Sequence, residues 1–145
     1  MQLTNLLPLL TLALTSTTLA NPVPANGVSD SLQKQIQTLE ITIVNITGDI
    51  VQNLPGLKTD YASGTKQFGS LVSGLQGPQP CSPFTPGQPE TKDQAVASLQ
   101  KSNLGLMQLS LDLLDPTKKV AKGDFHADVC GAWAYFNAVG KFVGA

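Results

Sequence analysis

The sequence has no arginine, one histidine and two cysteines, and charged residues make up only 13% of its 145 positions. Arginine is the side chain that captures phosphate and carboxylate groups in a bidentate manner, and nucleic-acid-binding proteins need a clustered basic face. With a formal net charge of −1, this composition argues against nucleic acid as a partner. The apolar run at residues 6–14 is shorter than the roughly 20 residues that span a bilayer, so we expect no transmembrane segment.

Residues that support catalysis are equally scarce. A histidine-based mechanism would have to use His126, within the D-x-H-x-D segment 124–128. Side chains two apart on a helix point about 200° away from each other, so this segment gathers a metal site only if it is extended. The helical pattern favours a histidine near a helix end, with a metal ligand or a catalytic base as the alternatives.

Carboxylate pairs are the other candidates for chemistry. Asp112 with Asp115, and Asp124 with Asp128, are close enough on a helix to share a face. Helix-terminal capping explains Asp115 and Asp124 without catalysis, and one tryptophan and two tyrosines offer few sugar-binding platforms. No G-x-S-x-G, P-loop, HExxH or dinucleotide-binding motif is present. We therefore predict no catalytic residue, no metal, no cofactor and no enzyme activity.

The first twenty residues indicate export. A short apolar run at 6–14 and a polar stretch precede Thr18-Leu19-Ala20, which has small residues at both positions that signal peptidase inspects. We predict a signal peptide over residues 1–20, a flexible lead-in over 21–28 and a single helical domain over 29–145. The mature protein is then secreted, to the extracellular space or the cell wall.

Apolar spacing predicts four helices. The first has apolar residues at alternating spacings of four and three from Leu32 to Ile50, and the next two cover about 57–75 and 92–114. The fourth follows Gly123, with Asp124 as its cap. Asp30 with Gln33, and Thr91 with Gln94, resemble capping boxes at the starts of the first and third helices.

Five prolines in residues 77–89 forbid a helix and predict an extended crossover between the second and third helices. The resulting fold class is all-α, a four-helix bundle with this crossover. Cys81 lies in the crossover and Cys130 on the last helix. An even cysteine count in an exported chain predicts one disulfide, which would contribute on the order of 4 kcal/mol by closing its long loop. The C-x-x-C spacing of a redox-active pair is absent.

Two surface features suggest contacts with other molecules. Asn45-Ile46-Thr47 is an N-glycosylation sequon, and Asn45 should project away from the helix seam. Lysines 118, 119 and 122 form either a solvated face or a contact for anionic lipid.

The third helix carries more leucines than one packing seam uses, which means either a leucine-rich core or an apolar ligand space. The residues predicted to line that space are Phe68, Leu104, Met107, Leu111, Leu114, Trp133 and Phe136.

The layout of a signal peptide, an amphipathic helix over 32–50 and a later leucine-rich helix resembles the fungal family of hydrophobic-surface-binding and cell-wall galactomannoproteins. The resemblance implies an all-helical domain that binds fatty acids, other lipids or apolar surfaces outside the cell. Our leading hypothesis is thus a secreted, non-enzymatic protein that binds an apolar ligand or surface. The alternative is an effector or cell-wall protein that acts through contact with a host or cell-wall protein.

Overall fold

The structure is a computed structural model that describes residues 30–75, 80–81 and 86–144, and this part of the chain is helical without strands. The all-α prediction is confirmed. The predicted signal peptide and lead-in, and much of the predicted crossover, lie outside the described residues. The four long helices are α2 (Asp30–Gln52), α3 (Leu57–Leu75), α4 (Lys92–Asp112) and α5 (His126–Ala138), followed by the short α6 (Gly140–Val143).

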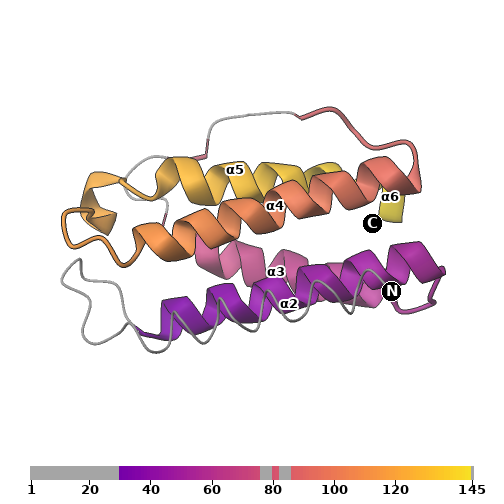
Figure 1. The fold of residues 1–145 in the computed structure, drawn as a ribbon, viewed down its shortest axis with the longest axis horizontal. Coiled ribbons are helices and arrows are strands. Elements are labelled where there is room, and N and C mark those ends of the chain that lie inside the picture. Colours follow the sequence, from indigo (N-terminus) through magenta and orange to yellow (C-terminus); the bar gives the residue numbers. More distant parts are fainter. Residues whose placement is uncertain (1–29, 76–79, 82–85, 145) are drawn as a thin grey trace.

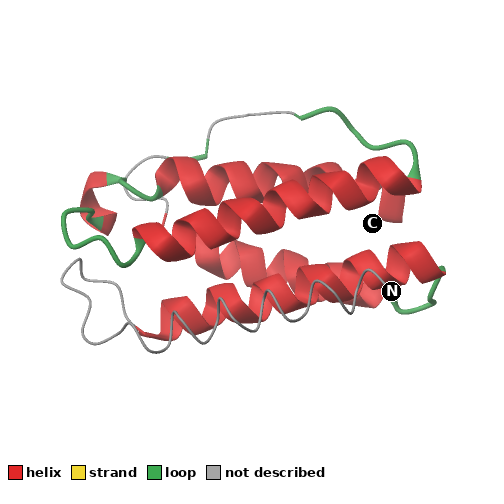
Figure 2. Ribbon diagram, in the orientation of Figure 1, coloured by secondary structure: helices red, strands yellow, loops and turns green. Residues whose placement is uncertain are grey.

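The long helices lie side by side (Figures 1 and 2). Helix α2 contacts α3 and α4, and α5 contacts the same two helices. Helices α3 and α4 run in the same direction, so the end of α3 and the start of α4 lie at opposite ends of the molecule (Figure 1). None of the described helices combines the length and the apolar character needed to cross a membrane.

Helix α2 forms because its apolar residues fall on one narrow stripe. Ile36, Leu39, Ile43, Ile46 and Ile50 are each at most 2% exposed, as the heptad spacing predicts. The helix ends at Gln52, and the next residue, Asn53, has a positive φ of 55°, a left-handed conformation that asparagine tolerates better than most residues. The Leu54 N–H then donates to the Asp49 carbonyl over 2.9 Å, which closes the turn.

The two predicted capping boxes have different outcomes. At the start of α4, the Thr91 hydroxyl accepts a hydrogen bond from the Gln94 N–H at 3.2 Å, so this cap is confirmed. The predicted back-bond from Gln33 to the start of α2 is wrong, because the Gln33 side chain reaches α4 instead. Its Oε1 accepts from the Ser110 hydroxyl at 3.0 Å, and its Nε2 donates to the Ser110 carbonyl at 3.4 Å.

The connection between α4 and α5 also differs from expectation. The sequence predicts Asp124 as the cap of the fourth helix, but its carboxylate accepts from the Lys119 N–H at 2.8 Å. Helix α5 begins two residues later with no side-chain cap, after a short 3-10 helix, η1 (Val120–Lys122). Helix α5 ends at Ala138, and α6 follows as a separate turn.

Aromatic rings fill the centre of the core. The Phe136 ring stacks on Tyr61 with 4.6 Å between centroids and lies 4.9 Å from the Phe68 ring. The Tyr61 hydroxyl donates to the Phe136 carbonyl at 2.8 Å, and burial raises the pKa of Tyr61 to about 12. Phe136 approaches α3 at Gly64, where an added Cβ would lie 2.7 Å from the ring. The absence of a side chain at position 64 therefore lets α3 and α5 meet.

Two glycines of α3 should respond in opposite ways to alanine. Gly64→Ala should lower the free energy of unfolding by about 1–3 kcal/mol, because the Phe136 ring is held by its aromatic neighbours and cannot yield. A Cβ added at Gly69 would meet no neighbour within 4 Å, so Gly69→Ala should raise it by about 0.5–1 kcal/mol through helix propensity. Denaturant titration followed by circular dichroism measures both, and equal effects would contradict this account of the packing.

Candidate functional site

Three leucines of the predicted lining face outward, Leu104 and Leu111 in the C-terminal half of α4 and Leu114 in the turn that follows it. Leu104 is 62% exposed, Leu111 is 63% exposed and Leu114 is 41% exposed. With the half-buried Met107, they follow one another at spacings of three and four residues, which places Leu104, Met107 and Leu111 on one face of the helix, with Leu114 just beyond its end. We call this set, Leu104, Met107, Leu111 and Leu114, the leucine stripe.

The stripe faces solvent because the opposite side of α4 is occupied by small residues. The Ser98 hydroxyl donates to the Tyr135 carbonyl and the Ser102 hydroxyl to the Ala132 carbonyl, each over 2.8 Å. An added Cβ at Gly105 would lie 3.1 Å from the Ala132 Cβ. Helix α4 therefore packs against α5 through serine and glycine, with other leucines such as Leu109 buried beside them.

The aromatic members of the predicted lining are part of the core instead. Phe68 and Phe136 are completely buried, and Trp133 is partly buried against the same cluster. The Trp133 ring lies 5.2 Å from Phe68 and 6.5 Å from Phe136. The structure thus divides the seven predicted residues into a packed aromatic group and an exposed leucine stripe, and it does not bring them together around one space.

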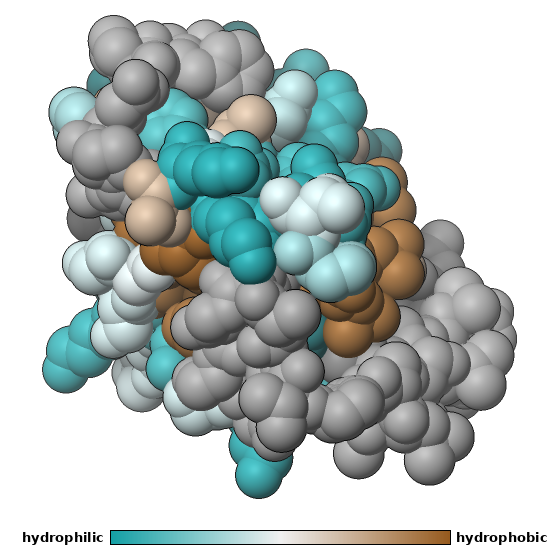
Figure 3. All heavy atoms as spheres, turned by 90° about the vertical axis from the view of Figure 1, so that its left-hand side faces the viewer, coloured by the Kyte–Doolittle hydropathy of each residue, from teal (hydrophilic) through white to brown (hydrophobic). Residues whose placement is uncertain are grey.

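Charged residues of both signs surround the C-terminal end of α4. Lysines 118, 119 and 122 are accompanied by aspartates 112, 115, 124 and 128. The Asp115 carboxylate accepts from both the N–H and the hydroxyl of Thr117, which lowers its pKa. Figure 3 views this end of the molecule and shows polar residues beside exposed apolar ones. The predicted lysine cluster is therefore part of a mixed-charge surface.

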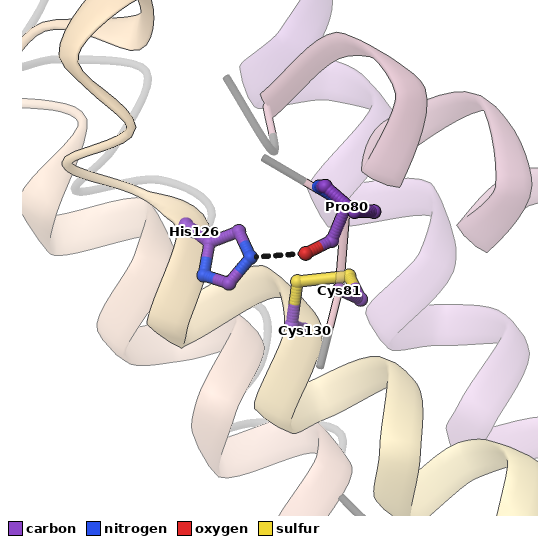
Figure 4. Close-up of a disulfide and its surroundings, with 4 residues drawn as sticks. All are labelled: Pro80, Cys81, His126 and Cys130. Carbon is purple, nitrogen blue, oxygen red and sulfur yellow. Dashed lines mark hydrogen bonds between the residues drawn. A yellow bond between two sulfur atoms is a disulfide. The ribbon is translucent and has the colours of Figure 1, made fainter. Parts of the chain in front are cut away.

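The predicted disulfide between Cys81 and Cys130 is confirmed, with 5.4 Å between the two Cα atoms. It joins the described residues Pro80 and Cys81 to the first turns of α5 (Figure 4). The Nε2 of His126 lies 2.9 Å from the Pro80 carbonyl oxygen. Because that oxygen only accepts, the histidine holds the same segment by donating from Nε2.

The D-x-H-x-D segment does not gather its side chains. Asp124 accepts from the Lys119 N–H and His126 contacts Pro80, whereas Asp128 is hydrogen-bonded to Asp112. The three groups face different partners. This arrangement agrees with the interpretation of His126 as a residue at a helix end.

The structure pairs carboxyl groups that the sequence did not suggest. Asp128 meets Asp112 of α4, where burial and then the neighbouring carboxyl raise the pKa of Asp128 to about 7. Asp49 of α2 meets Asp60 of α3, and the same causes raise the pKa of Asp49 to about 6. Each pair joins residues on two adjacent helices. Because sequence spacing reveals only neighbours on one helix, the predicted pairs Asp112 with Asp115 and Asp124 with Asp128 missed these contacts.

A third acid is buried on α2. Glu40 is 3% exposed, and burial raises its pKa to about 7. Charged side chains are rarely buried without a partner because desolvation favours the neutral form. Glu40, Asp49 and Asp128 therefore all carry pKa values raised first by burial.

The predicted glycosylation acceptor lies on the surface of α2. Asn45 is exposed, as the helix seam predicts, while the hydroxyl of Thr47 donates to the Ile43 carbonyl at 2.9 Å. Glycan attachment at Asn45 stays a prediction.

Comparison of the chain with protein-family models, characterised proteins and solved structures gives no match. The described residues define the class only as an all-helical, disulfide-bonded protein. Any proposal about function consequently depends on the surfaces of this chain itself.

The Asp49–Asp60 pair makes stability depend on pH. The folded-state pKa of Asp49 is raised to about 6. Its contribution to the free energy of unfolding is therefore fully present below about pH 4, the pKa of an aspartate in the unfolded chain, and is lost as the pH rises through 6. Asp49→Asn places an amide beside Asp60 and removes the repulsion between the carboxylates. The variant should gain stability relative to the parent at pH 8 and not at pH 4.

Melting temperatures across this pH range measure the effect. The exposed Asp93 supplies a matched control, because Asp93→Asn changes a carboxylate outside either pair. The expected result is a shallower loss of melting temperature between pH 4 and 8 for Asp49→Asn alone. Parallel pH profiles for Asp49→Asn and the parent would show that the Asp49–Asp60 pair does not determine how stability changes between pH 4 and 8.

Proposed function

We propose that this protein is a secreted, non-enzymatic helical bundle that binds a hydrophobic surface or an apolar ligand such as a fatty acid or lipid. The proline-rich segment 77–89 crosses between the second and third helices, and the disulfide holds it to α5. The observation that carries the proposal is the leucine stripe on α4. Extracellular space or the cell wall is the proposed location, in agreement with the signal peptide predicted from the sequence.

The position of the stripe favours contact at the surface over insertion between the helices. The aromatic residues that would line an internal site already pack on one another around Phe136. The stripe, in contrast, presents apolar side chains without moving a helix. A flat apolar phase or the acyl region of a lipid assembly can therefore be reached by α4 in its present conformation.

The size of the stripe sets the strength of this contact. Fully burying a leucine side chain contributes about 1.5–3 kcal/mol, and Leu104 and Leu111 each keep more than 60% of their surface exposed. Covering both should contribute about 2–3 kcal/mol, or roughly a 30- to 150-fold change in affinity. Because the surrounding charges are mixed, the attraction should be largely independent of ionic strength.

A protein partner is the second candidate, and the same observation favours it. An exposed apolar stripe bordered by polar residues is also typical of a protein–protein contact. A secreted effector or cell-wall protein would use the stripe to bind one partner of complementary shape. Binding to pure lipid or to a plain hydrophobic surface distinguishes the two proposals, because a stripe that recognises one protein partner is not expected to bind either of them.

Replacing the two most exposed leucines should remove surface binding and leave the fold intact. The double variant Leu104→Ser with Leu111→Ser should bind neutral phosphatidylcholine vesicles or polystyrene beads roughly 30- to 150-fold more weakly. Its melting temperature should change little because neither side chain fills the core. Co-sedimentation with vesicles and depletion by beads measure the binding.

A matched control changes apolar residues of another helix. Ile41 and Val51 of α2 are 41% and 50% exposed, so Ile41→Ser with Val51→Ser removes exposed apolar surface away from α4. This variant should bind like the parent. Equal loss in both variants, or no binding by the parent to vesicles and beads, would contradict the proposal. Saturable quenching of Trp133 by a soluble fatty acid would point to an internal ligand instead.

A further inference from the structure

Three potential metal ligands meet where the disulfide joins α5. His126 and Cys130 are four residues apart on α5, so their side chains share one face of the helix. Cys81 approaches that face from the segment 80–81 (Figure 4). One ligand atom from each of Cys81, His126 and Cys130 lies within 4.8 Å of the other two. Imidazole and two thiolates are a donor set that zinc accepts in tetrahedral sites.

While the disulfide is intact its sulfurs cannot bind zinc, because zinc binds thiolates. Reduction by two equivalents of a small thiol transfers two electrons and two protons to the sulfurs, and the reductant leaves as its own disulfide. The two cysteine thiols then give up their protons as the metal–sulfur bonds form. The sulfurs must move only to about 3.8 Å apart, the edge of a tetrahedron with zinc–sulfur bonds of about 2.3 Å.

The third ligand is already oriented by the oxidised protein. The Nε2 of His126 points toward the segment that carries Cys81 and donates to the Pro80 carbonyl (Figure 4). Moving the ring proton to Nδ1 frees the Nε2 lone pair for a metal. Cys81 and His126 are only partly buried, so a small thiol and an ion can approach the site from the side of these two residues.

We propose that, after a small thiol reduces its disulfide, the protein binds one zinc ion through Cys81, Cys130 and His126, with water in the fourth position. In the oxidised protein the disulfide and the bond from His126 to Pro80 hold the segment to α5. In the reduced protein the ion takes over this attachment. The proposal does not depend on what the leucine stripe binds.

Cobalt titration of the full chain tests this site. The protein is reduced with a phosphine, which competes weakly for metals, and Co²⁺ is added without oxygen. We expect one equivalent to bind, with the intense visible bands of tetrahedral cobalt and a thiolate charge-transfer band, and Zn²⁺ to displace it. Zn²⁺ should also raise the melting temperature of the reduced protein, because an ion that binds the folded state stabilises it.

Variants distinguish the proposed ligands from other cysteine or carboxylate contacts. Cys81→Ser and Cys130→Ser should each abolish the charge-transfer band, and His126→Ala should weaken Co²⁺ binding at least tenfold. Asp124→Asn, which alters an exposed carboxylate in the same segment, should bind like the parent. Circular dichroism of the oxidised His126→Ala and Asp124→Asn proteins checks that each folds.

Three results would overturn the proposal. The first is Co²⁺ binding without a thiolate band. The second is equal affinity in the parent and His126→Ala, which would mean that the two cysteines bind the ion in an unfolded chain. The third is a melting temperature of the reduced protein that does not respond to Zn²⁺. The oxidised parent, which lacks free thiols, is the blank for every titration.

Discussion

The close contact between α4 and α5 decides which side of α4 meets water. Two serine hydroxyls, from Ser98 and Ser102, donate to carbonyls of α5. Buried hydroxyls that lose such partners cost about 1–3 kcal/mol each, so the helix cannot rotate about its axis without a large penalty. Gly105 completes this inner face. With small and polar residues turned inward, Leu104 and Leu111 are left on the outer side, and the proposed binding surface follows from that orientation.

The acidic residues with raised pKa values lie at separate positions on the helices. Asp49 and Asp128 each meet another carboxyl group across a contact between two helices, and Glu40 is buried within α2. A general acid or base needs access to a substrate proton. Asp49 and Asp128 instead lie where helices pack, and burial together with a neighbouring carboxyl raises their pKa values, whereas burial alone raises the pKa of Glu40. The proposal of a non-enzymatic role is consistent with this placement.

The disulfide and the leucine stripe occupy different helices and support different proposals. The disulfide, with His126 beside it, attaches residues 80–81 to α5. The stripe lies on α4. A change in the oxidation state of the cysteines would therefore act first on α5, and it would reach the stripe through the contacts between α4 and α5, which include the serine hydroxyls of α4 and the Asp112–Asp128 pair.

Local sequence patterns predicted the helices well. The spacing of apolar residues located α3 at Leu57–Leu75 and the start of α4 at Lys92, because these signals act within one or two turns of the chain. The Thr91 cap is a local signal of the same kind. The disulfide was predicted from the cysteine count alone, since only one intramolecular pairing was available. Contacts between distant residues were not predictable in this way. Gln33 bonds to Ser110 rather than to its own helix start, because a neighbouring segment offered a competing partner.

The surplus leucines of the third predicted helix also show which features the sequence predicts and which ones packing decides. Composition established that this helix has more apolar residues than one seam can bury, but not which of them are buried. That choice came from packing, because the hydroxyls of Ser98 and Ser102 donate to carbonyls of another helix. The spacing of apolar residues shows which residues share a face of a helix, whereas the partner that each face contacts depends on residues far away in the sequence.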